Sequence, residues 1–167
     1  MLGKDFKEFI ASLSARGVEY LVIGGYAVAY HGFPRYTKDL DIWIGPSASN
    51  VARLLKAMED FGFGSLGLTA ADFQDPTTVI QLGHPPYRID LLCGVGGLDF
   101  SKAYARREQV VLGDLTVSFI AREDLVAAKR LAGRHQDLAD VENLTSGGTA
   151  STPPPPKARC RRAPRKA

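Results

Sequence analysis

Three aspartates stand inside apolar stretches of this sequence, where a carboxylate is uncommon. Asp39 and Asp41 alternate with apolar residues in 39–44 (DLDIWI), and Asp90 lies between an isoleucine and a leucine. Alternation with a period of two predicts β-strands and places Asp39 and Asp41 on one face of one strand. Carboxylate oxygens on neighbouring strands suit Mg²⁺, with phosphates as its further ligands. The three acids are therefore candidates for metal-assisted phosphoryl or nucleotidyl transfer.

The pair of carboxylates on one strand face needs compensation. At about 5 Å, two such charges repel by roughly 3 kcal/mol at an effective dielectric constant near 20. A bound cation, a shared proton, or a Lys or Arg brought in by the fold would offset this repulsion. Arg35 and Lys38 are near in sequence, and Arg88 lies on the strand face of Asp90, where it could pair with an aspartate or contact a substrate. The sequence leaves these alternatives open.

A pair of glycines precedes the acids by some 13 residues. Residues 21–23 form an apolar run typical of a buried strand, Gly24 and Gly25 follow, and residues 26–30 form a short apolar helical segment. Glycines let the backbone approach an anion, and the start of a helix presents free N–H groups. A Gly-Gly pair alone more often marks a tight turn. Together with the three acids, it indicates a phosphate site.

These residues must be positioned by a small mixed sheet. The fold class predicted from the periodicity is α/β (α+β), with helices packed against the sheet and a helical cap at the C-terminal end. Further strands are expected at 77–82, 88–92, 110–112 and 115–120, the last two as a hairpin. Helices are expected at 4–16, from Ser47 to near Gly62, briefly at 69–72, and at 100–107, 123–131 and 135–144, the last with Leu138, Val141 and Leu144 facing inward.

Composition bounds the class of protein. The 167 residues suffice for one domain with a real core, and 45% hydrophobic with 23% charged residues is ordinary for a globular protein. No apolar run reaches the length of a membrane span, and no signal peptide opens the chain. Two cysteines form neither a disulfide framework nor a metal knuckle, and the three histidines lack ligand spacing. We expect a cytoplasmic protein without membrane contact.

The last 23 residues differ from the rest. We assign residues 1–144 to one folded domain and 145–167 to a tail, because the tail contains four consecutive prolines and no apolar periodicity. The tail contains six Lys and Arg residues and no acid. Because the whole chain has a net charge of only +3, residues 1–144 are mildly acidic. The tail is expected to be disordered. Its charge is either simply solvated or makes weak, salt-sensitive contact with nucleic acid.

The combined pattern resembles a known family. Three stretches carry the resemblance: GGYAVAYHGFPRYTKDLDIWI, RIDLL and AREDLVAAKRLAGRHQDLADVENL. The pattern is similar to that of the nucleotidyltransferase superfamily that includes DNA polymerase beta. It is most similar to the minimal bacterial nucleotidyltransferases grouped with AbiEii-type abortive-infection and toxin–antitoxin proteins. The resemblance covers roughly residues 4–144 and is specific as a combination.

The resemblance implies a role for each matching residue. Gly24 and Gly25 would hold a nucleoside triphosphate through their backbone. Asp39 and Asp41 would ligate two Mg²⁺ ions, which Mn²⁺ could replace. Asp90 would ligate the catalytic ion and help to deprotonate an acceptor hydroxyl, which attacks the α-phosphorus while pyrophosphate leaves.

Further nucleotide contacts are predicted beside the acids and in a later helix. Arg35, Thr37 and Lys38 precede the acids, where they could contact phosphate or form a solvated loop. Lys129 lies in the helix where such proteins often direct a base toward the phosphates, although it could equally be a solvated lysine. The start of the last helix, residues 134–137, is interpreted as structural.

Two functions are compatible with this pattern. The first is transfer of a nucleoside monophosphate from an NTP to a hydroxyl of a protein, a tRNA or a small molecule, in a toxin–antitoxin or phage-defence setting. The second is a catalytically weak, antitoxin-like module that neutralises a small partner protein. The sequence identifies neither the preferred base nor the acceptor.

Overall fold

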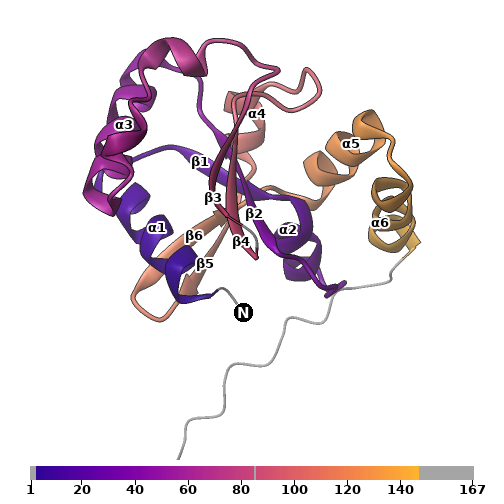
Figure 1. The fold of residues 1–167 in the computed structure, drawn as a ribbon. Helices are drawn as coiled ribbons and strands as arrows, with labels where there is room; N and C mark the ends of the chain where they lie inside the picture. Colours follow the sequence, from indigo (N-terminus) through magenta and orange to yellow (C-terminus); the bar gives the residue numbers. More distant parts are fainter. Residues whose placement is uncertain (1–2, 85, 147–167) are drawn as a thin grey trace, which may run out of the picture.

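The computed structural model describes residues 3–84 and 86–146 of the chain. Six strands form one mixed sheet, and six helices flank it (Figure 1). The helices are α1 (Lys4–Ala15), α2 (Gly24–Tyr30), α3 (Ala48–Phe61), α4 (Phe100–Ala105), α5 (Arg122–Ala132) and α6 (His135–Ser146). The strands are β1 (Tyr20–Ile23), β2 (Asp39–Ile44), β3 (Val79–His84), β4 (Tyr87–Leu92), β5 (Glu108–Leu112) and β6 (Leu115–Phe119). The predicted α/β fold class is therefore confirmed.

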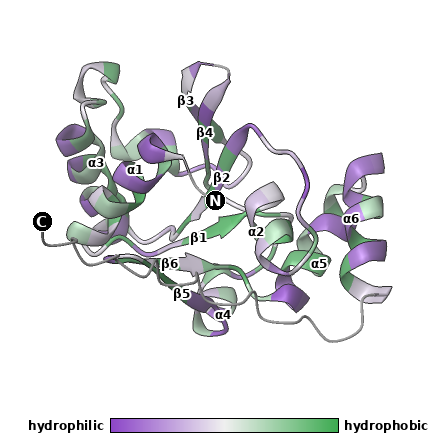
Figure 2. Cartoon of the chain, turned by 90° about the horizontal axis from the view of Figure 1, so that it is seen from below, coloured by the Kyte–Doolittle hydropathy of each residue, from purple (hydrophilic) through white to green (hydrophobic). Residues whose placement is uncertain are grey.

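The sheet has the strand order β3-β4-β2-β1-β6-β5. The two central strands, β1 and β2, run antiparallel, and each has a parallel neighbour on its outer side, β6 beside β1 and β4 beside β2. All four residues of β1 are buried, as expected for a central strand covered on both faces. Figure 2 shows this apolar strand at the centre of the molecule, between the two groups of helices.

Five of the six helices form two groups. Helices α1 and α3 pack together on one side of the sheet, and α2, α5 and α6 lie on the other (Figures 1 and 2). The N-terminus of α3 is capped by the Ser47 hydroxyl, which accepts a hydrogen bond from the Asn50 N–H, and Gly62 ends the helix in a left-handed conformation. The buried side chains of α1 and α3 cover one face of the sheet, so the chemical groups must gather on the other.

Most predicted elements are present with shifted ends. The hairpin forms around Gly113-Asp114 as predicted. Strand β3 begins two residues later than expected and extends through His84, because it pairs with β4 along its whole length. Helix α6 continues through Thr145 and Ser146, two residues into the predicted tail. The rest of that tail, 147–167, lies outside the described residues. Across 3–84 and 86–146, no helix is long and apolar enough to cross a membrane.

Candidate active site

The pairing of β2 with β4 brings the three predicted acids together. In this parallel ladder Asp41 is opposite Asp90, and Asp39 is opposite Arg88. Paired residues of neighbouring strands project to the same side of a sheet, so all four side chains share one face. The opposite face of β2 is apolar and fully buried in the core. The alternation read from the sequence therefore separates the core from a polar site.

Arg88 compensates two of the acids. Its Nε and Nη2 donate to the two oxygens of Asp90 at 2.7 and 3.0 Å, and Nη2 also donates to Asp39 Oδ2 at 2.9 Å. Of the alternatives left open by the sequence, the structure has an arginine of β4, rather than Arg35 or Lys38, between the carboxylates. The fork geometry of guanidinium makes such charge-assisted bonds among the strongest in proteins.

Asp41 has a different environment. Its partial burial, followed by the nearby charges of Asp90 and Asp39, raises the pKa of this carboxyl from 3.8 to about 6. More distant Lys129 and Arg134 oppose the shift but do not cancel it. The three carboxylates therefore retain negative charge that the protein does not fully neutralise.

The glycine pair lies directly against the acids. Gly24 and Gly25 begin α2 rather than forming a separate turn before it. A Cβ added at Gly24 would overlap the Asp41 carboxylate, and one added at Gly25 would come within 2.7 Å of the Thr37 side chain. Gly24 also has a φ of 66°, which other residues adopt only with strain. The glycines are thus required for the close approach of α2 to β2.

We expect Gly24→Ala to lower the free energy of unfolding by about 2 kcal/mol, since it adds a steric overlap to left-handed strain. Gly17→Ala is the matched control, because Gly17 has a φ of 64° but nothing within 4 Å of an added Cβ. This control should lose only about 1 kcal/mol, from strain alone. Urea denaturation of both variants measures the difference. Equal losses would show that the contact with Asp41 costs nothing.

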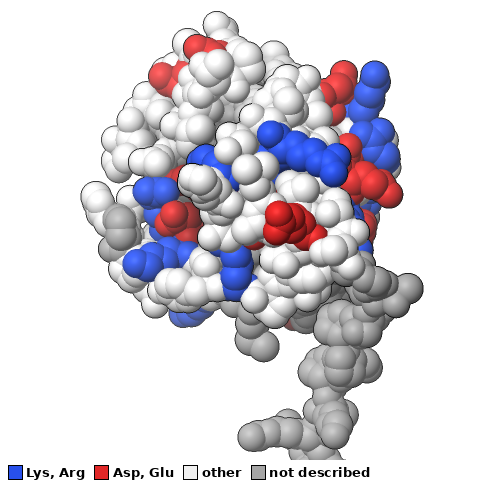
Figure 3. All heavy atoms as spheres, turned by 90° about the vertical axis from the view of Figure 1, so that its right-hand side faces the viewer, with Lys and Arg blue, Asp and Glu red and all other residues white. Residues whose placement is uncertain are grey.

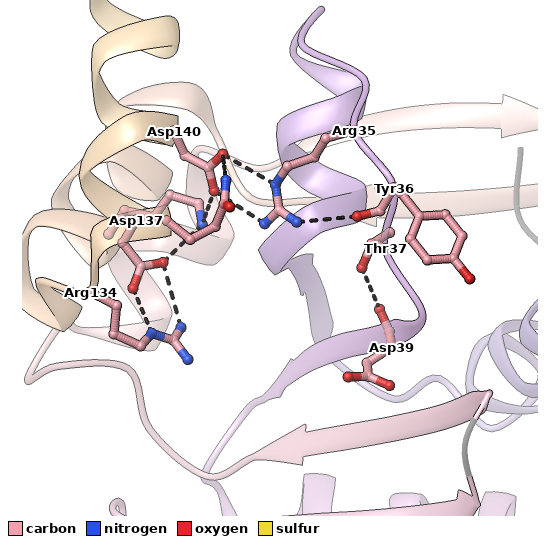
Figure 4. Close-up of polar contacts among 9 residues, drawn as sticks. Arg35, Tyr36, Thr37, Asp39, Arg134, Asp137 and Asp140 are labelled. Atoms are coloured by element: carbon pink, nitrogen blue, oxygen red, sulfur yellow. Dashed lines mark hydrogen bonds and ion pairs between the residues drawn. The ribbon is translucent and has the colours of Figure 1, made fainter.

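A basic cluster faces the acids from the other side of the site. It consists of Arg35, Lys129 and Arg134, held by Asp137 and Asp140 of α6 (Figure 4). Asp140 accepts from Arg35 Nε and Nη2 at 3.1 Å each and pairs with Lys129 Nζ at 2.7 Å. Asp137 pairs with Lys129 Nζ at 3.2 Å and with Arg134 Nε at 2.6 Å. These bonds connect α5 and α6 to the loop before β2.

The two carboxylates of α6 are unusual because they are buried. Asp140 is 1% exposed and Asp137 is 3% exposed. Burial by itself would raise the pKa of Asp140, but the hydrogen bonds from Lys129 and Arg35 outweigh it, so the pKa is lowered. For Asp137, bonds from Arg134 and Lys129 outweigh burial in the same way. Both carboxylates are therefore charged at neutral pH and hold their cations in place.

Acids, glycines and basic cluster line one cavity of about 300 Å³. The residues that line it are Gly24, Gly25, Arg35, Thr37, Asp39, Asp41, Arg88, Asp90, Lys129, Arg134, Gln136 and Asp137. Eight of the nine residues predicted from the sequence are among them. Lys38 is placed elsewhere: it is exposed, its ammonium lies 6.0 Å from the centre of the Tyr36 ring, and it lines a neighbouring cavity.

A match to a family model accompanies this geometry. A family described as a nucleotidyltransferase of unknown function (DUF6036) matches residues 4–147. The chain belongs to this nucleotidyltransferase family. The predicted resemblance to nucleotidyltransferases is thus confirmed, whereas the closer resemblance to AbiEii-type proteins stays a prediction. No curated protein sequence matches the chain.

A solved structure shares the fold of this nucleotidyltransferase. It is the crystal structure of lincosamide antibiotic adenylyltransferase LnuA in its lincomycin-bound form. The two are similar with a TM-score of 0.50 over 87% of this chain and 98% of that one, at 15% sequence identity. At this identity the likeness is evidence for a common fold and for nothing finer.

Several site residues of the nucleotidyltransferase were not recognised from its sequence. Arg134 and Asp137 were interpreted as structural, yet both line the cavity with Gln136. Leu138 was expected inward but is 47% exposed. The buried stripe of α6 is instead 137, 140, 141 and 144, which has ideal helical spacing. The helical spacing of the buried face could be read from the sequence. It was missed because two of the four buried positions are aspartates, whereas the prediction considered only apolar residues.

The carboxylates of this nucleotidyltransferase suit a divalent cation, but Arg88 is bonded to two of them. Three carboxylates on one face are the ligands that Mg²⁺ and Mn²⁺ prefer, and burial together with the charges of Asp90 and Asp39 raises the pKa of Asp41. Within 3–84 and 86–146, however, no three His, Cys, Asp or Glu side chains are grouped to hold a metal ion. The guanidinium of Arg88 lies among the oxygens such an ion would use. The residues therefore fit a metal once Arg88 has moved.

Proposed function

We propose that this cavity binds a nucleoside triphosphate and transfers its nucleoside monophosphate to a hydroxyl group. The supporting observation is the division of charge within a single cavity. One wall has three carboxylates with one guanidinium, and the opposite wall has three cations with the carboxylate of Asp137. Asp140, which does not line the cavity, holds Arg35 and Lys129 from behind this wall. A divalent cation bound to a polyphosphate has the complementary arrangement. Figure 3 shows basic and acidic side chains interspersed on the face that includes α5 and α6.

The basic wall is suited to the phosphates. Lys129 is only 6% exposed, so its ammonium is neither solvated nor mobile, contrary to the alternative that the sequence left open. Arg35 and Arg134 are likewise fixed by two bonds each to a carboxylate. Cations that are already oriented stabilise developing charge without reorganising during the reaction. They would hold the β- and γ-phosphates and the pyrophosphate that leaves.

The glycines and the acids are suited to the reacting centre. Gly24 and Gly25 line the cavity wall, and each lies so close to Asp41 or Thr37 that no side chain would fit there. In the proposed reaction Asp90 accepts the proton of the acceptor hydroxyl, whose oxygen forms a bond to the α-phosphorus. The bond from this phosphorus to the bridging oxygen breaks, and the pyrophosphate takes the electron pair. Mg²⁺ held by Asp39, Asp41 and Asp90 would neutralise charge on the phosphates.

The reaction can be tested with α-labelled NTPs and Mg²⁺ over candidate acceptors, including protein, tRNA and small alcohols. We expect labelled product from the wild type and at least about a tenfold lower rate from Asp90→Asn, which cannot accept the proton. Asp114→Asn is the control, since Asp114 is exposed in the β5–β6 turn. Equal labelling by the wild type and Asp90→Asn would exclude the proposal. A rise in melting temperature with Mg²⁺–NTP reports binding separately from turnover.

A further inference from the structure

The position of Arg88 conflicts with metal binding. Its guanidinium is bonded to both oxygens of Asp90 and to Oδ2 of Asp39, at 2.7 to 3.0 Å. A divalent ion held by Asp39 and Asp90 would bind oxygens of the same two carboxylates, at about 2.0–2.1 Å for Mg²⁺. The ion and the guanidinium would weaken each other's binding to these carboxylates, because two cations repel each other at this distance. The metal therefore competes with an internal cation.

The remaining cations of the cavity are in a different position. Arg35, Lys129 and Arg134 are paired with Asp137 and Asp140, which belong to α6 and lie outside the acidic wall. A metal at the acidic wall leaves these pairs intact. Arg88 differs because its partners are themselves the proposed metal ligands. Metal binding would thus release Arg88 while the basic cluster keeps its partners.

From this contrast we propose that Arg88 is a built-in counter-cation that exchanges with the metal during nucleotide binding. A free divalent ion must displace the guanidinium and leave it without an anion, so it binds weakly. A metal–triphosphate complex brings an anion with it, and the released Arg88, which lines the same cavity, pairs with a phosphate. The metal is therefore loaded together with the nucleotide. This inference rests on the proposed nucleotidyl transfer and adds an order of binding to it.

Exchange predicts opposite effects of one substitution on two affinities. In Arg88→Gln, Asp39 and Asp90 lose their internal cation, so free Mn²⁺ should bind at least about tenfold tighter than to the wild type. The same variant lacks the guanidinium that pairs with phosphate, so Mn²⁺ with a non-hydrolysable ATP analogue should bind at least about threefold weaker. Both affinities are measured by titration with electron paramagnetic resonance of Mn²⁺, without turnover.

Arg16→Gln is the control for loss of a fork-shaped ion pair. Arg16 bonds both oxygens of Asp60 at 2.6 and 2.9 Å, with both side chains exposed and outside the cavity, so its variant should match the wild type. Equal affinity of the wild type and Arg88→Gln for free Mn²⁺ would overturn the exchange and leave the proposed function intact. No binding of the Mn²⁺–nucleotide by the wild type would count against both. If Arg88→Gln does not fold, Arg88→Met, which also removes the charge, decides: tighter binding of free Mn²⁺ supports the exchange, and unchanged binding overturns it.

Discussion

Replacing Asp140 with alanine is expected to lower the free energy of unfolding by about 3 kcal/mol, more than a hundredfold in the folding equilibrium. Asp140 is 1% exposed and pairs with Lys129 and Arg35. Removing it leaves the ammonium of Lys129, itself 6% exposed, with Asp137 alone at 3.2 Å. Arg35 is less affected, because its side chain is 31% exposed and can be hydrated. The loss is measured by urea denaturation at pH 7.

The matched control for this prediction is Glu142→Ala, on the same helix but exposed, which should change stability by less than about 0.5 kcal/mol. The pH dependence gives a second check. The pKa of Asp140 is lowered in the folded state, so its contribution is complete above the ordinary value of 3.8 and is lost as pH falls through the lowered one. Asp140→Ala should therefore lose less stability on acidification than the wild type. A loss below about 1 kcal/mol at pH 7 would contradict a role for these ion pairs in holding α6.

Asp41→Asn, in contrast, should stabilise the folded protein. Without metal, we expect this substitution to raise the free energy of unfolding by up to about 3 kcal/mol above pH 7. The reason is that folding raises the pKa of Asp41 from 3.8 to about 6, and each unit corresponds to about 1.4 kcal/mol. Asparagine has nearly the same shape but no charge that burial would desolvate or that Asp90 and Asp39 would repel. Urea denaturation in the presence of EDTA measures the gain.

The stability gain of Asp41→Asn should depend on pH. For a carboxyl whose pKa is raised by folding, the folded protein binds the proton more tightly between about pH 4 and pH 6, so stability falls as pH rises through this window. The benefit of Asp41→Asn should therefore be small near pH 4 and full above pH 7. Asp114→Asn, in the exposed turn, should give no such trend. A gain that is the same at both pH values would contradict electrostatic repulsion as its cause.

The sequence was most informative where structure is local. The alternation in β2 predicted the strand and the common face of Asp39 and Asp41, because side-chain direction in a strand depends only on position. The start of α3 at Ser47 and the hairpin of 110–120 were also predicted correctly, since caps and tight turns act through neighbouring residues. The acids and glycines predicted from local patterns line one cavity, and their roles in catalysis stay a prediction.

Contacts between distant segments were beyond such reasoning. The register of β2 against β4 decides which basic side chain neutralises the acids. That side chain, Arg88, is 49 residues from Asp39 in the sequence, so local patterns could not identify it. Lys38 was included with Arg35 and Thr37 by proximity alone, although neighbouring residues in an extended segment point in opposite directions. Figure 4 shows the Tyr36 ring directed away from the basic cluster, between the two residues that line the cavity.

The register of β2 on β4 also ties the arrangement of the site to the stability of the fold. A slip of one residue would turn Asp39 and Asp41 into the core and expose Leu40 and Ile42, both fully buried. The chain therefore has no partly misaligned state in which the acids remain in place but their spacing is wrong.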